Sequence, residues 1–231
     1  MTRHALIVGG ARGIGAAIAA DLLAQGLTVT IAGRRSRSPA LEAAGASWRV
    51  VDASVPEQAR ALIEDCEPVD ILVVAAGPYH RTPLLKETDA GWREMFAGNL
   101  DTVFYLTQAV LPGMKDRGFG RILTFSMANA DKLQANPMVT GHYIAKIGVL
   151  VLTRTLAKAG AGHGVTANCI SPGFIDSGSA PPEELARMLP KIPARRIGDL
   201  ADVVSAARYL LSDEASYVNG ANLHISGAWG V

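Results

Sequence analysis

Short apolar runs alternate with longer amphipathic stretches along the whole chain. The apolar runs are rich in β-branched residues and predict strands at 5–8, 28–32, 48–51, 71–76, 121–125, 165–170 and 222–225. Most of these runs are apolar on both faces, which is typical of parallel strands covered by helices on both sides. Helical periodicity of the apolar positions predicts helices near 56–65, 91–115, 141–160 and 200–212. Ile14, Ile18 and Leu22 repeat every four residues and predict one more helix, which stops at Gly26.

This alternation predicts an α/β fold, namely a doubly wound (Rossmann) parallel sheet of about seven strands with helices on both faces. We expect a single domain over residues 1–231 that both binds a nucleotide and carries the catalytic groups. Residues 177–193 are rich in proline and serine and interrupt the alternation. They are therefore predicted to form a lid over the substrate.

Composition and charge exclude several classes of protein. Charged residues make up 19% and apolar residues 49%, which provides ample material for a core, and the net charge of +1 gives no reason to expect nucleic acid or a membrane as partner. No apolar stretch reaches the ~18 residues of a membrane span. No signal peptide is recognised, and Cys66 and Cys169 are expected to be reduced core thiols, so we expect a cytoplasmic location. The histidines show no metal-binding spacing, and no metal site is predicted.

The first strand runs into the glycine-rich segment VGGARGIG, and a helix is predicted to begin there. Gly9, Gly13 and Gly15 allow a tight turn and a close approach of the backbone to a ligand. The amides at the helix start would then face a pyrophosphate. A turn that uses glycine for packing alone is the alternative.

The residues after the second strand bear on the choice of dinucleotide. A site that prefers NAD usually carries an acidic residue there, which binds the ribose 2′-hydroxyl. This chain has AGRR instead, with Arg34 and Arg35, and Arg12 lies in the glycine turn. Guanidinium groups near that ribose favour the 2′-phosphate of NADPH. Solvated surface arginines are the alternative.

Five segments resemble the short-chain dehydrogenase/reductase family, in particular its single-domain ketoreductases, over nearly the full length. VGGARGIG is similar to the family's TGxxxGxG, and VDAS to the segment whose aspartate meets the adenine. VVAAG resembles NNAG with both asparagines lost, GNLDTVF resembles NLxGxF, and ISPGFIDS resembles SPGxxxT. The glycine turn, the arginines and this resemblance together predict cofactor contacts at Gly9, Arg12, Gly13, Ile14, Gly15, Arg34, Arg35, Asp52, Ala53, Ala76, Gly77, Lys146, Pro172, Gly173, Ile175 and Ser177.

The family's proton chemistry uses a serine, a tyrosine and a lysine, with the tyrosine four residues before the lysine. The segment GHYIAK departs from this spacing. Alignment on the family places Lys146 at the catalytic lysine and therefore His142, rather than Tyr143, at the tyrosine. Met127 takes the place of the catalytic serine, with Ser126 one residue earlier. The family's active-site asparagine corresponds to Asn99.

Three sources of the proton remain open from the sequence. If the helix keeps the family register, His142 is the donor, since histidine has an ordinary pKa of about 6.5. If the start of the helix is unwound, Tyr143 reaches the cleft, with Ser126 re-aimed by a bulge. In the third alternative neither side chain donates, and substrate or water supplies the proton.

Together these features predict an NADPH-dependent oxidoreductase that reduces the carbonyl group of a small organic substrate. The loss of the serine leaves an atypical C=N or C=C reductase as an alternative. A different class is an NADP-binding sensor or a non-redox isomerase or dehydratase on the same fold. The resemblance further implies a symmetric homodimer or homotetramer.

Overall fold

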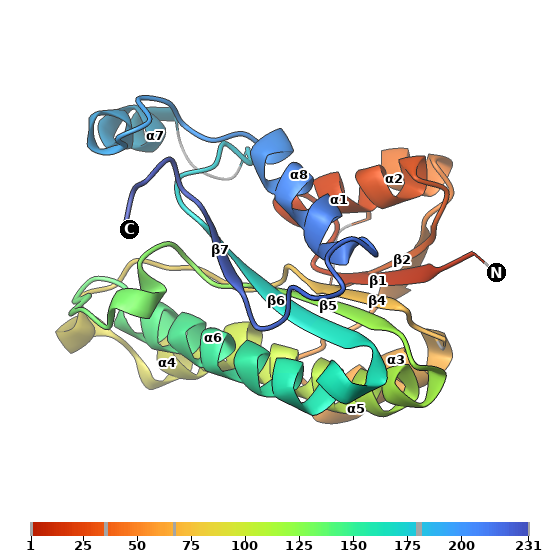
Figure 1. Cartoon of the computed structure of the whole chain (residues 1–231). Helices are drawn as coiled ribbons and strands as arrows, with labels where there is room; N and C mark the ends of the chain where they lie inside the picture. The colour runs from red at the N-terminus through yellow and green to blue at the C-terminus, as the bar shows by residue number, and fades with distance from the viewer. Residues whose placement is uncertain (1, 35–36, 67, 179–181, 231) are drawn as a thin grey trace.

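A seven-stranded sheet forms the centre of the molecule, with helices on both faces, which confirms the predicted fold class (Figure 1). The structure, a computed structural model, describes residues 2–34, 37–66, 68–178 and 182–230. The strands are β1 (His4–Val8), β2 (Thr28–Gly33), β3 (Ser47–Val50), β4 (Ile71–Val74), β5 (Gly120–Phe125), β6 (Val165–Pro172) and β7 (Asn222–Ile225). Their order is β3-β2-β1-β4-β5-β6-β7, and every neighbouring pair within this sheet is parallel.

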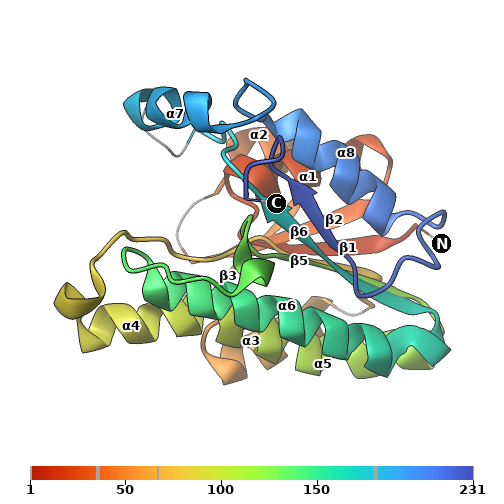
Figure 2. The same ribbon diagram turned by 60° about the vertical axis from the view of Figure 1, so that its left-hand side comes forward.

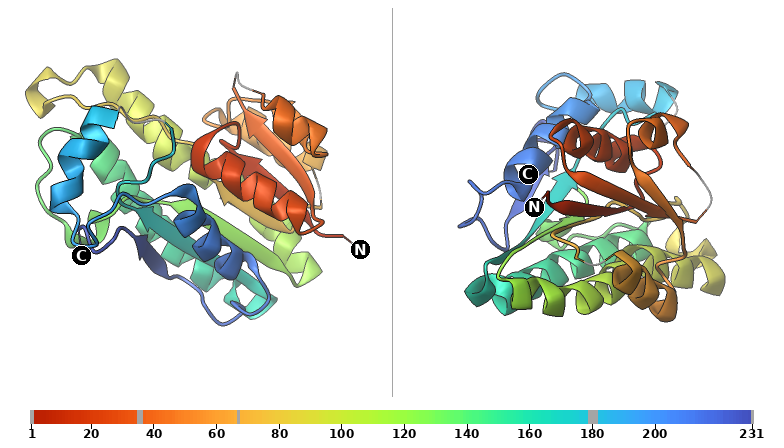
Figure 3. Two further views of the ribbon diagram at one scale, coloured as in Figure 1. Left: turned by 90° about the horizontal axis from the view of Figure 1, so that it is seen from above. Right: turned by 90° about the vertical axis from the view of Figure 1, so that its right-hand side faces the viewer.

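Two helical layers sandwich the sheet (Figure 3). The helices are α1 (Gly13–Ala24), α2 (Pro39–Ala43), α3 (Pro56–Cys66), α4 (Asp89–Phe96), α5 (Thr102–Arg117), α6 (Thr140–Gly160), α7 (Pro182–Met188) and α8 (Leu200–Leu211). Helices α1 and α8 bury their apolar faces on one side, and α3, α5 and α6 on the other. Apolar side chains on both faces of the strands fill the two cores, as the sequence pattern predicts. No helix within the described ranges is both long and apolar enough to cross a bilayer.

The helix predicted at 91–115 is interrupted. Helix α4 ends at Phe96, a π-helical turn spans Ala97–Asp101, and α5 follows. The turn contains Asn99, whose side-chain amide donates to the Met95 carbonyl at 3.0 Å and so satisfies a backbone acceptor next to the turn. Helical periodicity misses such a turn because one extra residue hardly disturbs the apolar pattern.

The segment predicted to be a lid contains regular structure. Helix α7 is followed by the 3₁₀ turn Leu189–Lys191, and residues 179–181 lie outside the described part of the chain. Helix α7 and the start of α4 lie at the same end of the molecule on opposite sides of the sheet (Figures 1 and 2). Further 3₁₀ turns occur at Leu84–Lys86, Ala130–Lys132 and Ala161–His163. Closure of 177–193 over a substrate stays a prediction.

The chain changes its direction of travel across the sheet between β1 and β4. Strands β1 to β3 extend the sheet one way, and β4 to β7 extend it the other way. In sheets of this kind the loops at the carboxyl ends of the strands leave a crevice at that point, which is the usual place for a ligand. The predicted site residues within the described part of the chain lie on segments that meet at these strand ends.

Candidate active site

The glycine-rich turn after β1 packs against the chain leaving β4. Gly9 has a φ of 87°, and a Cβ at this position would lie 2.5 Å from the backbone nitrogen of Ala76. A Cβ at Gly15 would collide with the carbonyl oxygen of Gly9. Arg12 at the N-cap of α1 makes no side-chain capping bond. The sequence therefore builds a turn only glycine can form and leaves the first amides of a 12-residue helix without a side-chain cap.

The chain leaving β6 crosses over this turn. A Cβ at Gly13 would lie 3.5 Å from the Cβ of Ser177, which places the two predicted cofactor contacts side by side. Ile175 is fixed by a parallel bridge to Gly198. Gly173 follows Pro172 at the end of β6, where a Cβ would lie 2.9 Å from the Cα of Ser226. The structure thus brings the first and sixth strand ends together.

Charged side chains gather at the ends of β2 and β3. Arg34 follows β2 and is exposed, and Asp52 follows β3, while Arg12 is exposed in the turn after β1. Asp52 accepts bonds from the Ser54 amide at 3.1 Å and the Ser54 hydroxyl at 2.6 Å. Burial alone would raise the pKa of Asp52, but these bonds and the nearby Arg34 guanidinium together hold it below its usual value. Ala53 is buried beside it, and Arg35 lies outside the described residues.

Lys146, Asn99 and Gly77 lie together beside the carboxyl ends of β4 and β5. The Nζ of Lys146 would be 3.5 Å from a Cβ at Gly77 and donates to the Phe125 carbonyl at 2.9 Å. Burial lowers the pKa of Lys146 to about 8, so the ammonium is retained at neutral pH. The amide nitrogen of Asn99 donates to Pro78, while its Oδ1 points toward Gly77 and is a buried acceptor with no partner among the described residues.

His142 sits one turn before Lys146 on α6 and is 8% exposed. Its Nδ1 is buried and has no hydrogen-bond partner in the described part of the chain. Burial is the main cause that lowers the pKa of His142 to about 3, and the Lys146 ammonium and His80 act in the same direction, against the Pro78 backbone. The imidazole is therefore neutral at physiological pH.

Tyr143 lies on the adjacent face of α6 and is 3% exposed. Its hydroxyl donates to the carbonyl of Asn129 at 2.9 Å and accepts from the amide of Gln134 at 3.2 Å. The helix is continuous from Thr140 through Gly160, so its start is not unwound around Tyr143. The phenol thus holds the segment 129–134 against α6.

Ser126 and Met127 follow β5. The hydroxyl of Ser126 donates to the backbone carbonyl of Lys146 at 2.8 Å, and the side chain is buried. Met127 is partly buried and packs on the core that α3, α5 and α6 share with the sheet. In this structure the Ser126 hydroxyl ties β5 to α6.

Sequence reasoning missed a second titratable pair at this edge. His80, on the loop after β4, contacts Glu87 with 2.7 Å between Nε2 and Oε2. Tyr79 packs edge-on against the His142 ring, with centroids 5.1 Å apart. Loop residues carry no periodic signal, so a pair separated by seven positions can be found only once the loop's path is known.

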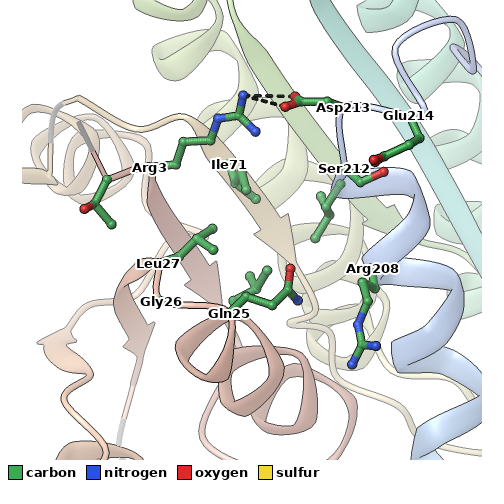
Figure 4. A pocket seen from close by; sticks show the side chains of 12 residues that line it. Arg3, Gln25, Gly26, Leu27, Ile71, Arg208, Ser212, Asp213 and Glu214 are labelled. Carbon is green, nitrogen blue, oxygen red and sulfur yellow. Dashed lines mark hydrogen bonds and ion pairs between the residues drawn. The ribbon is translucent and has the colours of Figure 1, made fainter.

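A separate hollow of about 350 Å³ lies at the opposite edge of the sheet (Figure 4). It is lined by Leu27 and Ile71 at the starts of two strands, and by Arg3, Arg208 and Asp213 among others. The Arg3 guanidinium pairs with Asp213 at 2.9 Å, and Arg208 pairs with Asp21. Both of these arginines are thus paired with carboxylates, and none of the predicted site residues lines the hollow.

Known proteins match this chain over nearly its whole length. A family model described as enoyl-(acyl carrier protein) reductase matches residues 9–229. The acetoacetyl-CoA reductase of Rhizobium meliloti is 38% identical over 238 aligned positions, covering 98% of this chain and 98% of that protein. The 3-oxoacyl-(acyl-carrier-protein) reductase FabG of Haemophilus influenzae is 33% identical and covers 96% of each chain.

Solved structures show the same arrangement. A protein described as a short chain dehydrogenase/reductase family protein superposes with a TM-score of 0.88, at 29% identity over 97% of this chain and 96% of that one. An Agrobacterium tumefaciens protein, provisionally named 2-deoxy-d-gluconate 3-dehydrogenase and solved with bound NADP, gives 0.88 at 33% identity, over 98% of this chain and 96% of that one.

Proposed function

Because this chain belongs to the short-chain dehydrogenase/reductase family, whose members are NAD(P)H-linked oxidoreductases that act on hydroxyl and keto groups, we propose that it is an NADPH-dependent ketoreductase. The observation that carries the proposal is the grouping at one edge of the sheet. Lys146 and the unpartnered Oδ1 of Asn99 both lie beside Gly77, and His142 stands one helical turn before Lys146.

The residues present fit a bound dinucleotide. Gly9 and Gly15 let the turn pack tightly, because a Cβ at either position would collide with backbone atoms, and the first turn of α1 offers amides to a pyrophosphate. Asp52 would hold the adenine end, and Lys146 and Asn99 would hold the nicotinamide ribose. When bound, the coenzyme would supply the hydride, and with it both electrons of the reduction.

We propose NADPH rather than NADH because cations replace the usual acid after β2. Arg34 lies near enough to Asp52 to lower its pKa, so its guanidinium reaches the region expected to hold the adenosine. Arg12 occupies the N-cap position of the helix that would face the phosphates, and its side chain makes no capping bond there. Bidentate contacts with a 2′-phosphate would stabilise NADPH, and NADH would leave both guanidinium groups without that partner.

His142 is the side chain we propose to donate to the substrate oxygen. The Tyr143 hydroxyl is already engaged by Asn129 and Gln134, and the Ser126 hydroxyl by the Lys146 carbonyl. A neutral imidazole N–H can polarise a carbonyl without the cost of a buried charge. The Lys146 ammonium adds a positive field that stabilises negative charge developing on that oxygen.

The substrate we propose is a 3-oxoacyl thioester, because the relatives above are named for reducing acetoacetyl-CoA or a 3-oxoacyl group on a carrier protein. The test is NADPH oxidation by the purified chain with acetoacetyl-CoA, set beside crotonyl-CoA as a C=C substrate. We expect turnover of the first alone, with at least about 100-fold loss in His142→Phe and little loss in Tyr143→Phe. Turnover of crotonyl-CoA alone would reject carbonyl reduction, and the reverse order of the two variants would reject His142 as donor.

We also propose that the chain assembles as a homodimer or homotetramer through α5 and α6. Both helices carry apolar side chains that are exposed in the single chain, namely Phe104 on α5 and Ile144 and Val151 on α6. Sedimentation equilibrium should give a multiple of 24.2 kDa, and Val151→Lys should lower it. A monomeric wild type would contradict the assembly.

A further inference from the structure

The loop between β4 and α4 carries an acid–base pair, His80 and Glu87, at the rim of the candidate active site. The imidazole Nε2 and the carboxylate Oε2 are 2.7 Å apart. The second carboxylate oxygen of Glu87 accepts from the Thr88 amide at 3.0 Å, so both oxygens are held. The Glu87 side chain is 13% exposed and the His80 side chain 29% exposed, so the imidazole keeps contact with water while its partner is largely covered.

The pair fixes which nitrogen of His80 carries a proton. The hydrogen bond from His80 is the main cause that holds the pKa of Glu87 below its usual value, so the carboxyl group is ionised. A carboxylate only accepts hydrogen bonds, and Nε2 of His80 must therefore be the donor. Nδ1 of His80 is the ring nitrogen that Glu87 does not engage. A base oriented by a carboxylate is the arrangement found in catalytic triads.

Glycine at position 91 leaves room for this pair. A Cβ there would lie 2.5 Å from Oε1 of Glu87 and 3.2 Å from Cε1 of His80. The Gly91 amide donates to the Thr88 hydroxyl at 3.0 Å, which caps α4 and anchors the residue next to Glu87. The start of α4 thus packs closely against His80 and Glu87 and holds them in place.

The pair lies close to His142. Tyr79, next to His80 in the chain, packs on the His142 ring, and His80 is near enough to contribute to the lowered pKa of His142. His142 is neutral and buried, so it cannot give up its only ring proton unless its other nitrogen gains one. Nδ1 of His142 is buried and has no hydrogen-bond partner among the described residues, so it could accept such a proton.

Resting on the ketoreductase proposed above, we infer that His80, oriented by Glu87, resupplies the proton that His142 gives to the substrate oxygen. One ring nitrogen of His142 releases a proton to the oxygen as the C=O π electrons move onto it. The other ring nitrogen takes a proton from Nδ1 of the His80 imidazolium, directly or through one water. The neutral His80 left behind still donates from Nε2 to Glu87 and regains a proton on Nδ1 from solvent. No net charge accumulates on the buried ring, and the substrate gains one proton beside the hydride.

Kinetics of matched variants test the relay. We expect His80→Gln to lower kcat with acetoacetyl-CoA by about 10- to 100-fold while KM changes by less than about 2-fold, because the group moves a proton and does not bind substrate. Glu87→Gln should give a smaller loss of kcat. Added imidazole should restore part of the activity of His80→Ala, which a purely structural role would not allow. His163→Gln, which replaces an exposed histidine in the 3₁₀ turn after α6, is the control and should match wild type.

A second readout needs neither coenzyme nor activity. The chain has five histidines, so ring N–H resonances can be assigned by substitution in ¹⁵N-labelled protein. The Nε2 proton of His80 should be shifted downfield and slow to exchange in wild type and in His163→Gln, and should be lost in Glu87→Ala. Its presence in Glu87→Ala, or an unchanged kcat in His80→Gln, would overturn the relay and leave the ketoreductase standing. Absence of turnover by wild type on any 3-oxoacyl thioester would overturn both.

Discussion

The buried histidine of the candidate active site, His142, should make the protein's stability sensitive to mild acid. His142 has a pKa of about 3 when folded, mainly through burial, against an ordinary value of 6.5. Between these values the unfolded chain binds a proton at this position and the native chain does not. This histidine therefore does not destabilise the fold above pH ~6.5, and its destabilising effect grows as the pH falls toward ~3.

The magnitude follows from proton linkage. One proton taken up only on unfolding changes the free energy of unfolding by about 1.4 kcal/mol per pH unit, so about 2 kcal/mol is lost between pH ~7.5 and pH ~5. His142→Gln removes the titrating group and leaves the other ionisable groups in place. The wild type should thus lose about 2 kcal/mol more than the variant over this interval.

Urea unfolding measures this difference. The chain has three tryptophans, so fluorescence and circular dichroism can follow the same transition at each pH. His163→Gln, at an exposed position, should run parallel to the wild type. If wild type and His142→Gln also run parallel to within about 0.5 kcal/mol, the imidazole is not buried in the neutral form, and its role as a neutral donor falls with it.

Three further changes test other parts of the molecule. Arg34→Asp should raise the Kd for NADPH at least about 10-fold more than the Kd for NADH, measured by coenzyme fluorescence, because the guanidinium would read the phosphate; equal losses would contradict this. Gly9→Ala should destabilise the fold by about 3 kcal/mol or more in urea titrations and abolish NADPH binding, because Gly9 has a φ of 87° and a Cβ there would lie 2.5 Å from the nitrogen of Ala76. A stable variant that binds NADPH would show that the glycine turn does not require glycine at this position. Thr88→Ala should cost about 1 kcal/mol of stability, because its hydroxyl caps α4 by accepting from Gly91 at 3.0 Å, and an unchanged midpoint would show that the cap contributes nothing.

The parts of the fold that follow from periodicity could be predicted from the sequence. Strands such as Ile71–Val74 are buried over their full length, so an unbroken apolar run marks them without any tertiary information. The glycine turn could also be predicted from the sequence, because Gly9 and Gly15 follow a strand. In the structure any side chain at these two positions would collide with the backbone. Both features are marked by short runs of residues in the sequence, although the atoms that a Cβ at Gly9 would meet belong to the distant Ala76.

The parts that depend on loop paths could not be predicted. Whether Tyr143 faces the crevice or the segment 129–134 depends on where that segment runs, and its course is set by contacts with Asn129 and Gln134 rather than by composition. The pairing of His80 with Glu87 likewise requires the loop after β4 to turn back on itself. Short polar segments leave such choices open until the core has positioned their ends.

The hydrogen bonds of Tyr143 predict epistasis between substitutions at Tyr143 and at its neighbour His142. The phenol fastens a segment in which Asn129 and Leu133 both adopt positive φ, of 65° and 50°, a conformation that most side chains avoid. Neighbouring positions of one helix would thus have two tasks, with the imidazole of His142 as the proposed donor and the phenol of Tyr143 holding the segment 129–134 in place. Replacing His142 by tyrosine and Tyr143 by histidine would place a family-like donor at position 142 but remove the hydrogen bonds that hold the segment 129–134. The effects of the two substitutions would therefore not be additive, and neither single variant would reveal the role of its residue alone.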